Sequence, residues 1–523
     1  LMRIDMVRLL QSGLRRGFSR VDAAMNRLYG WKHNPIYHSG ALAVALLIVL
    51  IATGVYLLLF YRLGSPYASM ERITEQAWLG RWIRTLHRYS ADAALVAAAV
   101  HGLRAFARRK SWGPRALAWV SGLIMVFFFF LCAWTGYVLV WDTHALVIAA
   151  AGARLLDLLP VFSEPLGRTF VGEQPIPSAF FFVNFFLHVA LPLAMGLLLW
   201  IHAARVARPA LLPPRPLLWG TVGVLFAASV FWPIRMAPEA DLLRIPVDVP
   251  LDLFYGFWIP LIAGVPAAVV WTVFLAVSGA LLLAPLWTRP SAPSRPLPSV
   301  VDEAVCTGCE QCYHDCPYEA ISMVDRVDGR AGMVARVDPD LCVSCGICAG
   351  SCAPMVVGPP GRSGRDQLAQ VRANLAERAP GPAEIVVIAC ARSAGELALR
   401  GKGQGIRLHP VSCVGTVHTS VVEQYVRSGA AGVLMVACPP GDCWNREGAK
   451  WAEQRLFHGR EAELKERVDR QRVHLAYAAE AETDRVIEEL ERFRARLEPG
   501  SGPGGDELDL IALCDRDPEP EAV

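Results

Sequence analysis

Two apolar segments of the chain each carry a pair of histidines fourteen residues apart. The segment "WIRTLHRYSADAALVAAAVHGLRAF", which begins at Trp82, contains His87 and His101, and the segment "NFFLHVALPLAMGLLLWIHAAR" contains His188 and His202. A helix rises about 1.5 Å per residue, so this spacing puts two imidazoles about 21 Å apart on nearly the same face. Ionisable side chains are costly inside a bilayer and usually face the protein interior. The pattern therefore predicts two stacked ligand sites between two membrane helices.

Paired imidazoles of this kind can hold two haems, one near each side of the membrane. We expect His87 and His188 to be the axial ligands of an outer b-type haem, and His101 and His202 those of an inner one. Two imidazoles leave no open position on the iron, so these haems would carry electrons rather than bind oxygen. The alternative is that each histidine is a hydrogen-bonded core residue, which two matched pairs disfavour.

Six apolar stretches are long enough to cross a hydrocarbon layer of about 30 Å. They cover residues 39–61, 84–107, 116–141, 179–204, 217–235 and 254–287. The loops 104–115 and 205–216 are basic, whereas the long loop 142–178 has only two basic residues. Because basic loops stay in the cytoplasm, we expect a multi-pass protein of the inner membrane with both termini in the cytoplasm. The basic amphipathic segment 1–38 is expected along the inner membrane surface.

Glycines recur at the same interval in two other spans. Gly40 and Gly54 lie fourteen residues apart in the first span, and Gly122 and Gly136 do so in the third. Missing side chains at these positions would leave room for flat macrocycles. Glycine pairs alone more often mean close helix packing, so they count here only together with the histidines.

Together with the stretch "TGYVLVWD" at 135–142, the histidine and glycine pairs resemble the haem-bearing part of the cytochrome b of quinol:cytochrome c oxidoreductases. The resemblance covers about residues 30–210. The resemblance implies that Arg84 and Arg104, which flank the two ligands of their helix, hold haem propionates. The alternative is that they only anchor the helix ends. Further along, "VPLDLFYGFW" at 249–258 stands in place of a Pro-Glu-Trp-Tyr stretch of the family's outer quinol-oxidation site. This departure argues against a bifurcating quinol oxidation at the outer face.

Eight of the fourteen cysteines form two runs with the spacing C-x2-C-x2-C-x3-C, in "CTGCEQCYHDCP" and "CVSCGICAGSCAP". In bacterial ferredoxin-like modules such runs bind two 4Fe-4S clusters, and the fourth cysteine of each run ligates the other cluster. The predicted ligands are Cys306, Cys309, Cys312 and Cys352 for cluster one, and Cys342, Cys345, Cys348 and Cys316 for cluster two. Zinc is the alternative, which the doubled spacing disfavours. Such thiolates imply a reducing, cytoplasmic setting.

Four sparser cysteines follow in a segment that alternates strands and helices. "EIVVIAC", "GIRLHPVSC" and "GVLMVAC" each precede a helical pattern, which predicts a small parallel sheet. The carboxyl ends of parallel strands converge on one crevice. There, a 2Fe-2S cluster is expected on Cys390, Cys413, Cys438 and Cys443.

With "VSCVG" and "ACPPGDCWNREG", residues 384–497 resemble the delta (iron–sulfur) subunit of methyl-viologen-reducing hydrogenases. The resemblance implies electron exchange with a flavoprotein like that of heterodisulfide reductase. The chain keeps only the minimum number of ligands, so four buried structural cysteines are the alternative.

The predicted fold is multidomain: a six-helix transmembrane di-haem bundle, a small α+β ferredoxin-like domain and a small α/β parallel-sheet domain. The parts are expected at 1–38 (amphipathic segment), 39–287 (bundle), 288–299 (Pro/Ser linker), 300–356 (ferredoxin-like), 384–497 (sheet) and 498–523 (disordered tail). The net charge of +3 without a basic domain argues against nucleic acid as a partner.

The order of the parts predicts a non-catalytic membrane subunit that carries electrons between a cytoplasmic redox enzyme and the quinone pool. That enzyme would be a separate flavin- or metal-containing dehydrogenase or a heterodisulfide-reductase-like protein. Moving one electron across the membrane is worth about 2.3 kcal/mol per 100 mV, so the reaction is electrogenic if quinone reacts on the outer side. A membrane anchor with a redox scaffold role and electron transfer to a periplasmic cytochrome are the alternatives. The sequence also leaves a dimer open.

Overall fold

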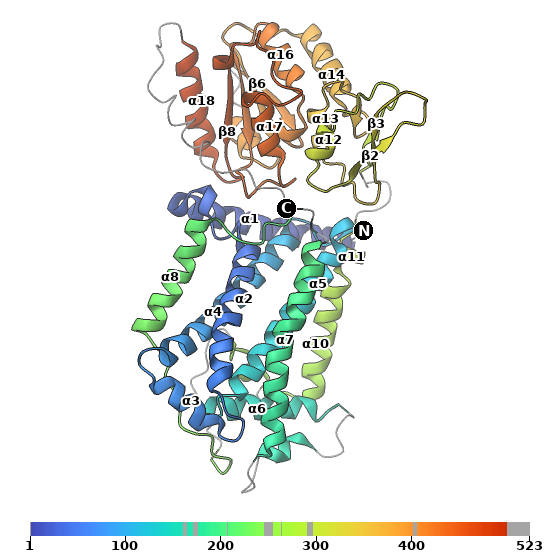
Figure 1. Cartoon of the computed structure of the whole chain (residues 1–523). Coiled ribbons are helices and arrows are strands. Elements are labelled where there is room, and N and C mark those ends of the chain that lie inside the picture. The colour runs from blue at the N-terminus through green and yellow to red at the C-terminus, as the bar shows by residue number, and fades with distance from the viewer. Residues whose placement is uncertain are drawn as a thin grey trace. The chain divides into compact units, whose positions relative to one another are not determined.

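The computed structural model describes residues 2–159, 165–170, 176–204, 206, 208–244, 255–262, 264–289, 296–400 and 405–498. The chain divides into two compact units, Leu1–Arg295 and Pro296–Val523 (Figure 1). The predicted tail lies outside the described residues from residue 499 onward, and so do residues 290–295 of the predicted linker. Asp252, in the stretch that replaces the family's quinol-site motif, also lies outside them.

The N-terminal unit is a bundle of helices. Four of its long helices are α2 (Ser39–Phe60), α4 (Gly80–Ala107), α5 (Ala116–Val138) and α7 (Ser178–Ala204). The other helices are α1 (Met2–Tyr29), α3 (Pro66–Glu75), α6 (Thr143–Leu156), α8 (Arg215–Phe231), α9 (Trp258–Ile262), α10 (Ala267–Leu282) and α11 (Ala284–Trp287). Helix α2 packs along α4, and α5 packs along α7. Helix α1 lies across one end of the bundle, and α3 and α6 lie at the other end (Figure 1).

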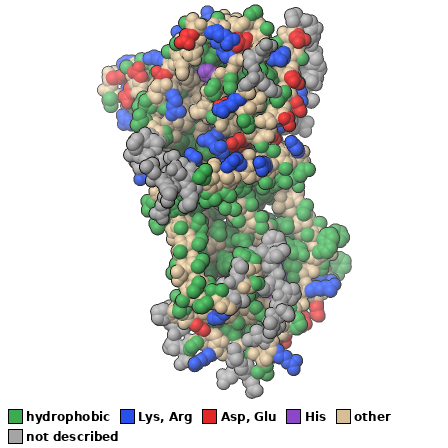
Figure 2. Space-filling view, turned by 180° about the vertical axis from the view of Figure 1, so that it is seen from behind, with side chains coloured by type: hydrophobic (Ala, Val, Ile, Leu, Met, Phe, Trp, Pro, Cys, Tyr) green, Lys and Arg blue, Asp and Glu red, His purple; other side chains and the backbone are tan. Residues whose placement is uncertain are grey.

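The flanks of this bundle are apolar. In the described part of the chain, three helices are long and apolar enough to cross a membrane: Ser39–Phe60, Gly113–Val138 and Ser178–Ala204. Large side chains such as Leu59 and Phe231 are exposed on the helix flanks. Figure 2 shows apolar side chains spread over the sides of this unit. So much exposed apolar surface is unusual in water and fits a lipid environment.

Three of the six predicted spans, 39–61, 116–141 and 179–204, coincide with these helices, and the last predicted span needs a correction. The stretch 254–287 does not form one helix, because Gly264 takes a positive φ of 77° and Pro266 caps α10. Helix α10 has 16 residues and α8 has 17, so each rises only about 24–26 Å. Within the predicted outer loop 142–178, the structure places α6, which the sequence did not predict.

The first part of the C-terminal unit is small and contains both helices and strands. Strand β1 (Val300–Val301) pairs with β4 (Val357–Gly358), and β2 (Ile321–Asp325) forms an antiparallel hairpin with β3 (Met333–Val337). The short helices α12 (Gln311–His314) and α13 (Ile347–Ser351) each begin inside one cysteine run. This arrangement agrees with the small α+β domain expected from the sequence.

The second part of the unit is a four-stranded parallel sheet with the strand order β6-β5-β7-β8. Strands β5 (Ile385–Cys390), β6 (Ile406–Val411) and β7 (Gly432–Ala437) match the three predicted strands, and β8 (Val473–Tyr477) adds a fourth. Central strands β5 and β7 are buried on both faces, which explains their continuous apolar sequence.

Helices cover both faces of this sheet. Helices α14 (Gly364–Glu377), α16 (Thr419–Arg427) and α17 (Gly448–Phe457) pack on one face, and α15 (Gly395–Leu399) and α18 (Thr483–Leu497) pack on the other. Helix α14 lies before the predicted start of this domain at residue 384, yet its Val371 and Leu375 belong to the sheet's core. Ser363 and Asp366 form a capping box at its first turn, which starts the helix locally.

Candidate cofactor sites

The four histidines of α4 and α7 face one another as two pairs. The ring centroid of His87 lies 6.3 Å from that of His188, and the centroid of His101 lies 6.4 Å from that of His202. A metal–imidazole bond is about 2 Å long and the ring centroid lies about 1 Å beyond the nitrogen, so two imidazoles on one metal have centroids roughly 6 Å apart. Each pair therefore fits the axial ligation of one haem iron.

The four predicted glycines lie against these imidazoles. The pairs are Gly40 with His101, Gly54 with His87, Gly122 with His202 and Gly136 with His188. A β-carbon at Gly40 or Gly136 would lie under 3 Å from the ring, whereas one at Gly54 or Gly122 would lie at 3.4 Å. The sequence predicted that the missing side chains make room for macrocycles, and this stays a prediction. The structure shows that they make room for the imidazole rings.

Hydroxyl groups next to these glycines contact the Nδ1 atoms of the imidazoles. The contacts are Thr53 Oγ1 to His87 (2.9 Å), Thr135 Oγ1 to His188 (3.1 Å) and Ser121 Oγ to His202 (3.1 Å). A hydrogen bond at Nδ1 fixes the ring orientation and directs Nε2 toward a metal. The sequence analysis missed these residues, although a Ser or Thr directly precedes each of the four glycines.

A cavity of about 370 Å³ opens beside the pair of His87 and His188. Its lining is mostly apolar, with Arg84, Arg88 and Asp142 among the few charged groups. Its size and lining are typical of a cofactor pocket. Arg84 lines this cavity, and its contact with a haem propionate stays a prediction. Arg88 was not predicted and lies on the same cavity.

The eight cysteines of the two runs line two separate cavities. One is lined by Cys306, Cys309, Cys312 and Cys352, and the other by Cys316, Cys342, Cys345 and Cys348. This is the predicted grouping, in which the fourth cysteine of each run crosses to the other group. Among the described residues, no three His, Cys, Asp or Glu side chains meet closely enough to hold a single metal ion. The two groups are defined by the cavities that their cysteines line.

The remaining four cysteines meet at the carboxyl edge of the parallel sheet. Cys390 ends β5 and Cys438 directly follows β7, and their Sγ atoms are 3.6 Å apart. The strand order reverses between β5 and β7, which is where open α/β sheets bind ligands. Cys413, just after β6, contacts both Cys390 and Cys443 through its side chain. All four thiols are buried, and a 2Fe-2S cluster on them stays a prediction.

Comparisons with known protein families agree with this geometry. Residues 26–208 match cytochrome b/b6/petB, residues 305–355 match the 4Fe-4S dicluster domain, and residues 385–499 match the methyl-viologen-reducing hydrogenase, delta subunit. The chain carries these three domains in this order.

Known relatives match the cytochrome b part. The menaquinol:cytochrome c reductase cytochrome b subunits of Bacillus subtilis (strain 168) and Geobacillus thermodenitrificans are each 25% identical over 183 residues, or 34% of this chain and 82% of the relative. Cytochrome b of Acanthamoeba castellanii is 29% identical over 171 residues, or 32% of this chain and 44% of the relative. A solved chain of a hyperthermophilic respiratory complex III has a TM-score of 0.41 and 20% identity, covering 50% of this chain and 78% of that chain.

In the cytochrome b domain, Arg104 lies in a different environment from Arg84. Its Nη1 atom lies 2.7 Å from Oδ1 of Asp22 in α1, and both side chains are almost fully buried. Its guanidinium also lies 4.9 Å from the ring centroid of Tyr37. Arg104 therefore helps to fix α1 on α4, which the sequence did not indicate. Its contact with a haem propionate stays a prediction.

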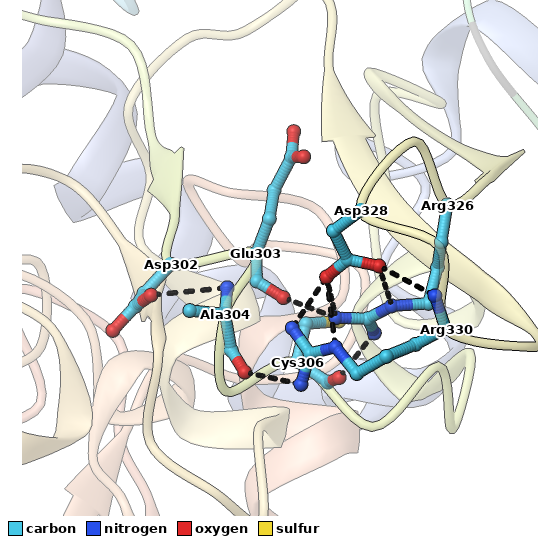
Figure 3. A network of polar contacts seen from close by, with 7 residues as sticks. All are labelled: Asp302, Glu303, Ala304, Cys306, Arg326, Asp328 and Arg330. Carbon is cyan, nitrogen blue, oxygen red and sulfur yellow. Dashed lines mark hydrogen bonds and ion pairs between the residues drawn. The ribbon is translucent and has the colours of Figure 1, made fainter.

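In the dicluster domain, two arginines brace the loop that carries Cys306 (Figure 3). Arg326 donates to the carbonyl oxygen of Cys306 (2.9 Å), and Arg330 donates to that of Ala304 (2.9 Å). Asp328 accepts hydrogen bonds from both arginines, which hold the pKa of its carboxyl well below the ordinary value. The β2–β3 hairpin is thereby tied to the first cysteine loop.

Backbone amides in the same domain donate to the cysteine sulfurs. The donors are Ala320 to Cys316 (3.4 Å), Val356 to Cys352 (3.3 Å) and Ser299 to Cys342 (3.4 Å). Hydrogen bonds to ligand sulfurs are one of the means by which proteins set the reduction potential of a cluster. Ser299 belongs to the predicted linker, so its contact with Cys342 was not expected.

Proposed function

We propose that this chain is a membrane electron-transfer subunit that links a cytoplasmic redox enzyme to the quinone pool. Its carriers would be one 2Fe-2S cluster, two 4Fe-4S clusters and two b-type haems. The observation that carries the proposal is the spacing of the two imidazole pairs, 6.3 and 6.4 Å, in a chain that also gathers three cysteine groups. When bound, these cofactors supply iron that takes up and releases single electrons.

The residues of the cytochrome b domain have distinct roles in this proposal. His87 and His188 would hold the outer haem, and His101 and His202 the inner one. The hydroxyls at their Nδ1 atoms keep the rings oriented. Arg84 and Arg88 would offset the negative charge of propionates at the outer cavity.

Quinone is the substrate class that the relatives support, because two of them are named as menaquinol:cytochrome c reductase subunits. We infer that quinone reacts near the outer pair, so that electrons cross most of the membrane before they reach it. This placement makes the reaction electrogenic, at about 2.3 kcal/mol per electron and 100 mV. The basic loops after α4 and α7 support a cytoplasmic side for the inner pair.

The C-terminal unit would receive electrons from a separate chain. The likeness of residues 385–499 to a hydrogenase delta subunit supports a partner of the dehydrogenase or heterodisulfide-reductase class. The four-cysteine edge of the sheet is the proposed entry point, and the eight cysteines of the dicluster domain would pass electrons onward.

The test compares His87→Ala and His101→Ala in the full chain, in membranes, with His458→Ala as a control. His458 is exposed and lies outside the histidine pairs and the cysteine runs. Reduced methyl viologen serves as the donor and a short-chain quinone as the acceptor. His87→Ala should lose one haem and abolish quinone reduction, while the inner haem is still reduced. His101→Ala should also prevent reduction of the outer haem.

Several outcomes would contradict the proposal. Quinone turnover that survives in His87→Ala would place quinone elsewhere than the outer pair. Haems that never become reduced during turnover would favour a redox scaffold. Reduction of an added cytochrome c in place of quinone would favour a periplasmic protein acceptor.

A further inference from the structure

A buried arginine of α17 lies where the dicluster domain meets the parallel-sheet domain. Arg455 is only 1% exposed. Its Nη1 atom donates to Ser351 Oγ (2.7 Å), and its Nη2 atom donates to the carbonyl oxygen of Gly415 (2.7 Å). Nη1 also lies 3.6 Å from Oδ2 of the equally buried Asp315.

Each of these contacts is next to a cysteine of a different group. Asp315 directly precedes Cys316, Ser351 directly precedes Cys352, and Gly415 lies two residues after Cys413. A single guanidinium therefore touches the loops that carry ligands of cluster two, of cluster one and of the four-cysteine edge.

The group at the sheet edge also lies close to that of cluster two. A β-carbon at Gly448 would lie 2.5 Å from Cys413 Sγ and 3.6 Å from the side chain of Ile347. A β-carbon at Gly346, between Cys345 and Cys348 in the chain, would lie 3.2 Å from the Thr416 side chain. Arg455 thus lies beside a close contact between the two domains.

The charges around Arg455 do not cancel. Burial lowers the pKa of Arg455 to about 10, which leaves the guanidinium charged at neutral pH. Asp315 pairs with Arg455 and with the partly exposed Arg460, so the trio keeps one net positive charge. Arg455 is close enough to Cys413 and Cys348 to interact with both electrostatically. A buried charge is screened only weakly by water and salt.

We propose that Arg455 is a positioning residue that holds the loops of all three iron–sulfur centres together and raises their reduction potentials. The inference rests on the proposed function, because it needs the clusters. Reduction adds one electron to a cluster and forms or breaks no bond. A fixed positive charge nearby stabilises the reduced form, because that form is the more negative one. The effect should be largest at cluster two and at the sheet edge.

The test is an anaerobic redox titration of the purified full chain, followed by EPR, with iron and sulfide measured on each sample. Arg455→Gln should lower the ratio of reduced to oxidised cluster at a fixed potential about tenfold, or about 59 mV for a one-electron couple. Asp315→Asn removes a negative charge and should shift the potentials upward. Arg455→Lys keeps the charge and should stay within about twofold of wild type. The control is Arg467→Gln, at an exposed arginine bound to Glu423, which should change nothing.

The outcomes separate this inference from the proposed function. Unchanged potentials in both Arg455→Gln and Asp315→Asn, with full iron and sulfide content, would overturn it. If Arg455→Gln loses its clusters, the Asp315→Asn variant provides the test. An upward shift of its reduction potentials supports the inference, and unchanged potentials overturn it. A wild-type chain without iron and sulfide would overturn the proposed function as well, and the iron content alone would reveal that case.

Discussion

Replacing Gly136 with alanine should displace the imidazole of His188, whereas the same change at Gly54, across the same histidine pair, should be tolerated. A β-carbon at Gly136 would lie 2.8 Å from Cε1 of His188, and one at Gly54 would lie 3.4 Å from Cε1 of His87. Carbon atoms in good contact are about 3.5–4.0 Å apart. The first contact is therefore a clash, and the second is close to ordinary packing.

The cost of the clash follows from what holds the His188 ring. Its Nδ1 atom contacts Thr135 Oγ1 (3.1 Å) and the carbonyl oxygen of Cys132 (3.0 Å), both on the same helix as Gly136. Relief of the clash must stretch these contacts or push α5 away from α7. Overpacking a buried position costs about 1–3 kcal/mol. Since about 1.4 kcal/mol is a tenfold change in affinity, the outer haem should bind roughly five- to 140-fold more weakly.

The assay measures haem per chain and the reduced-minus-oxidised spectrum of the purified full chain. Gly136→Ala should lose haem from the outer pair, and Gly54→Ala should keep the wild-type content. The inner pair offers the same contrast, because a β-carbon at Gly40 would lie 2.7 Å from His101 and one at Gly122 would lie 3.4 Å from His202. Equal haem content and equal spectra in Gly136→Ala and Gly54→Ala would refute the reasoning.

Three further predictions concern other parts of the chain. Asp22→Asn removes the carboxylate from a buried ion pair with Arg104, which should destabilise the packing of α1 by about 3–5 kcal/mol. Helix α1 should therefore be cleaved faster in limited proteolysis, and an unchanged digestion pattern would contradict this. The hydrogen bond from His474 lowers the pKa of the Glu489 carboxyl in the folded protein. This bond therefore stabilises the fold fully above the unfolded pKa of about 4.3, and the stabilisation is lost as the pH falls through the lower folded pKa. Glu489→Gln should therefore lower the thermal midpoint of unfolding at pH 7, and this midpoint should fall less in acid than that of wild type. Thermal midpoints of variant and wild type that change with pH in parallel would contradict this prediction. Cys390→Ser should remove the EPR signal of one centre and keep both 4Fe-4S signals, and loss of all three signals would show that the groups are not separate.

Local patterns of the sequence determined much of this protein. The fourteen-residue spacing of the histidines places them on one helix face, because helix geometry depends only on distance along the chain. The doubled cysteine runs likewise predicted which thiols share a cavity, and the structure groups them in the same way. The apolar strands 385–390 and 432–437 were recognisable because both of their faces are buried. The break in the last apolar stretch also had a local signal, Gly264 and Pro266, which its overall apolarity concealed.

Only the tertiary structure decided which polar groups meet inside the protein. Asp22 and Arg104 are 82 residues apart, and Arg455 is 104 residues from the Ser351 hydroxyl that it contacts. No repeat or local spacing links such residues, because their contact depends on how α1 packs on α4 and how α17 packs on α13. A buried charge must find its partner wherever the fold brings one, since leaving it unpaired is costly. The sequence thus predicted the candidate ligands, and the packing of distant segments determined the charges and hydrogen bonds around them.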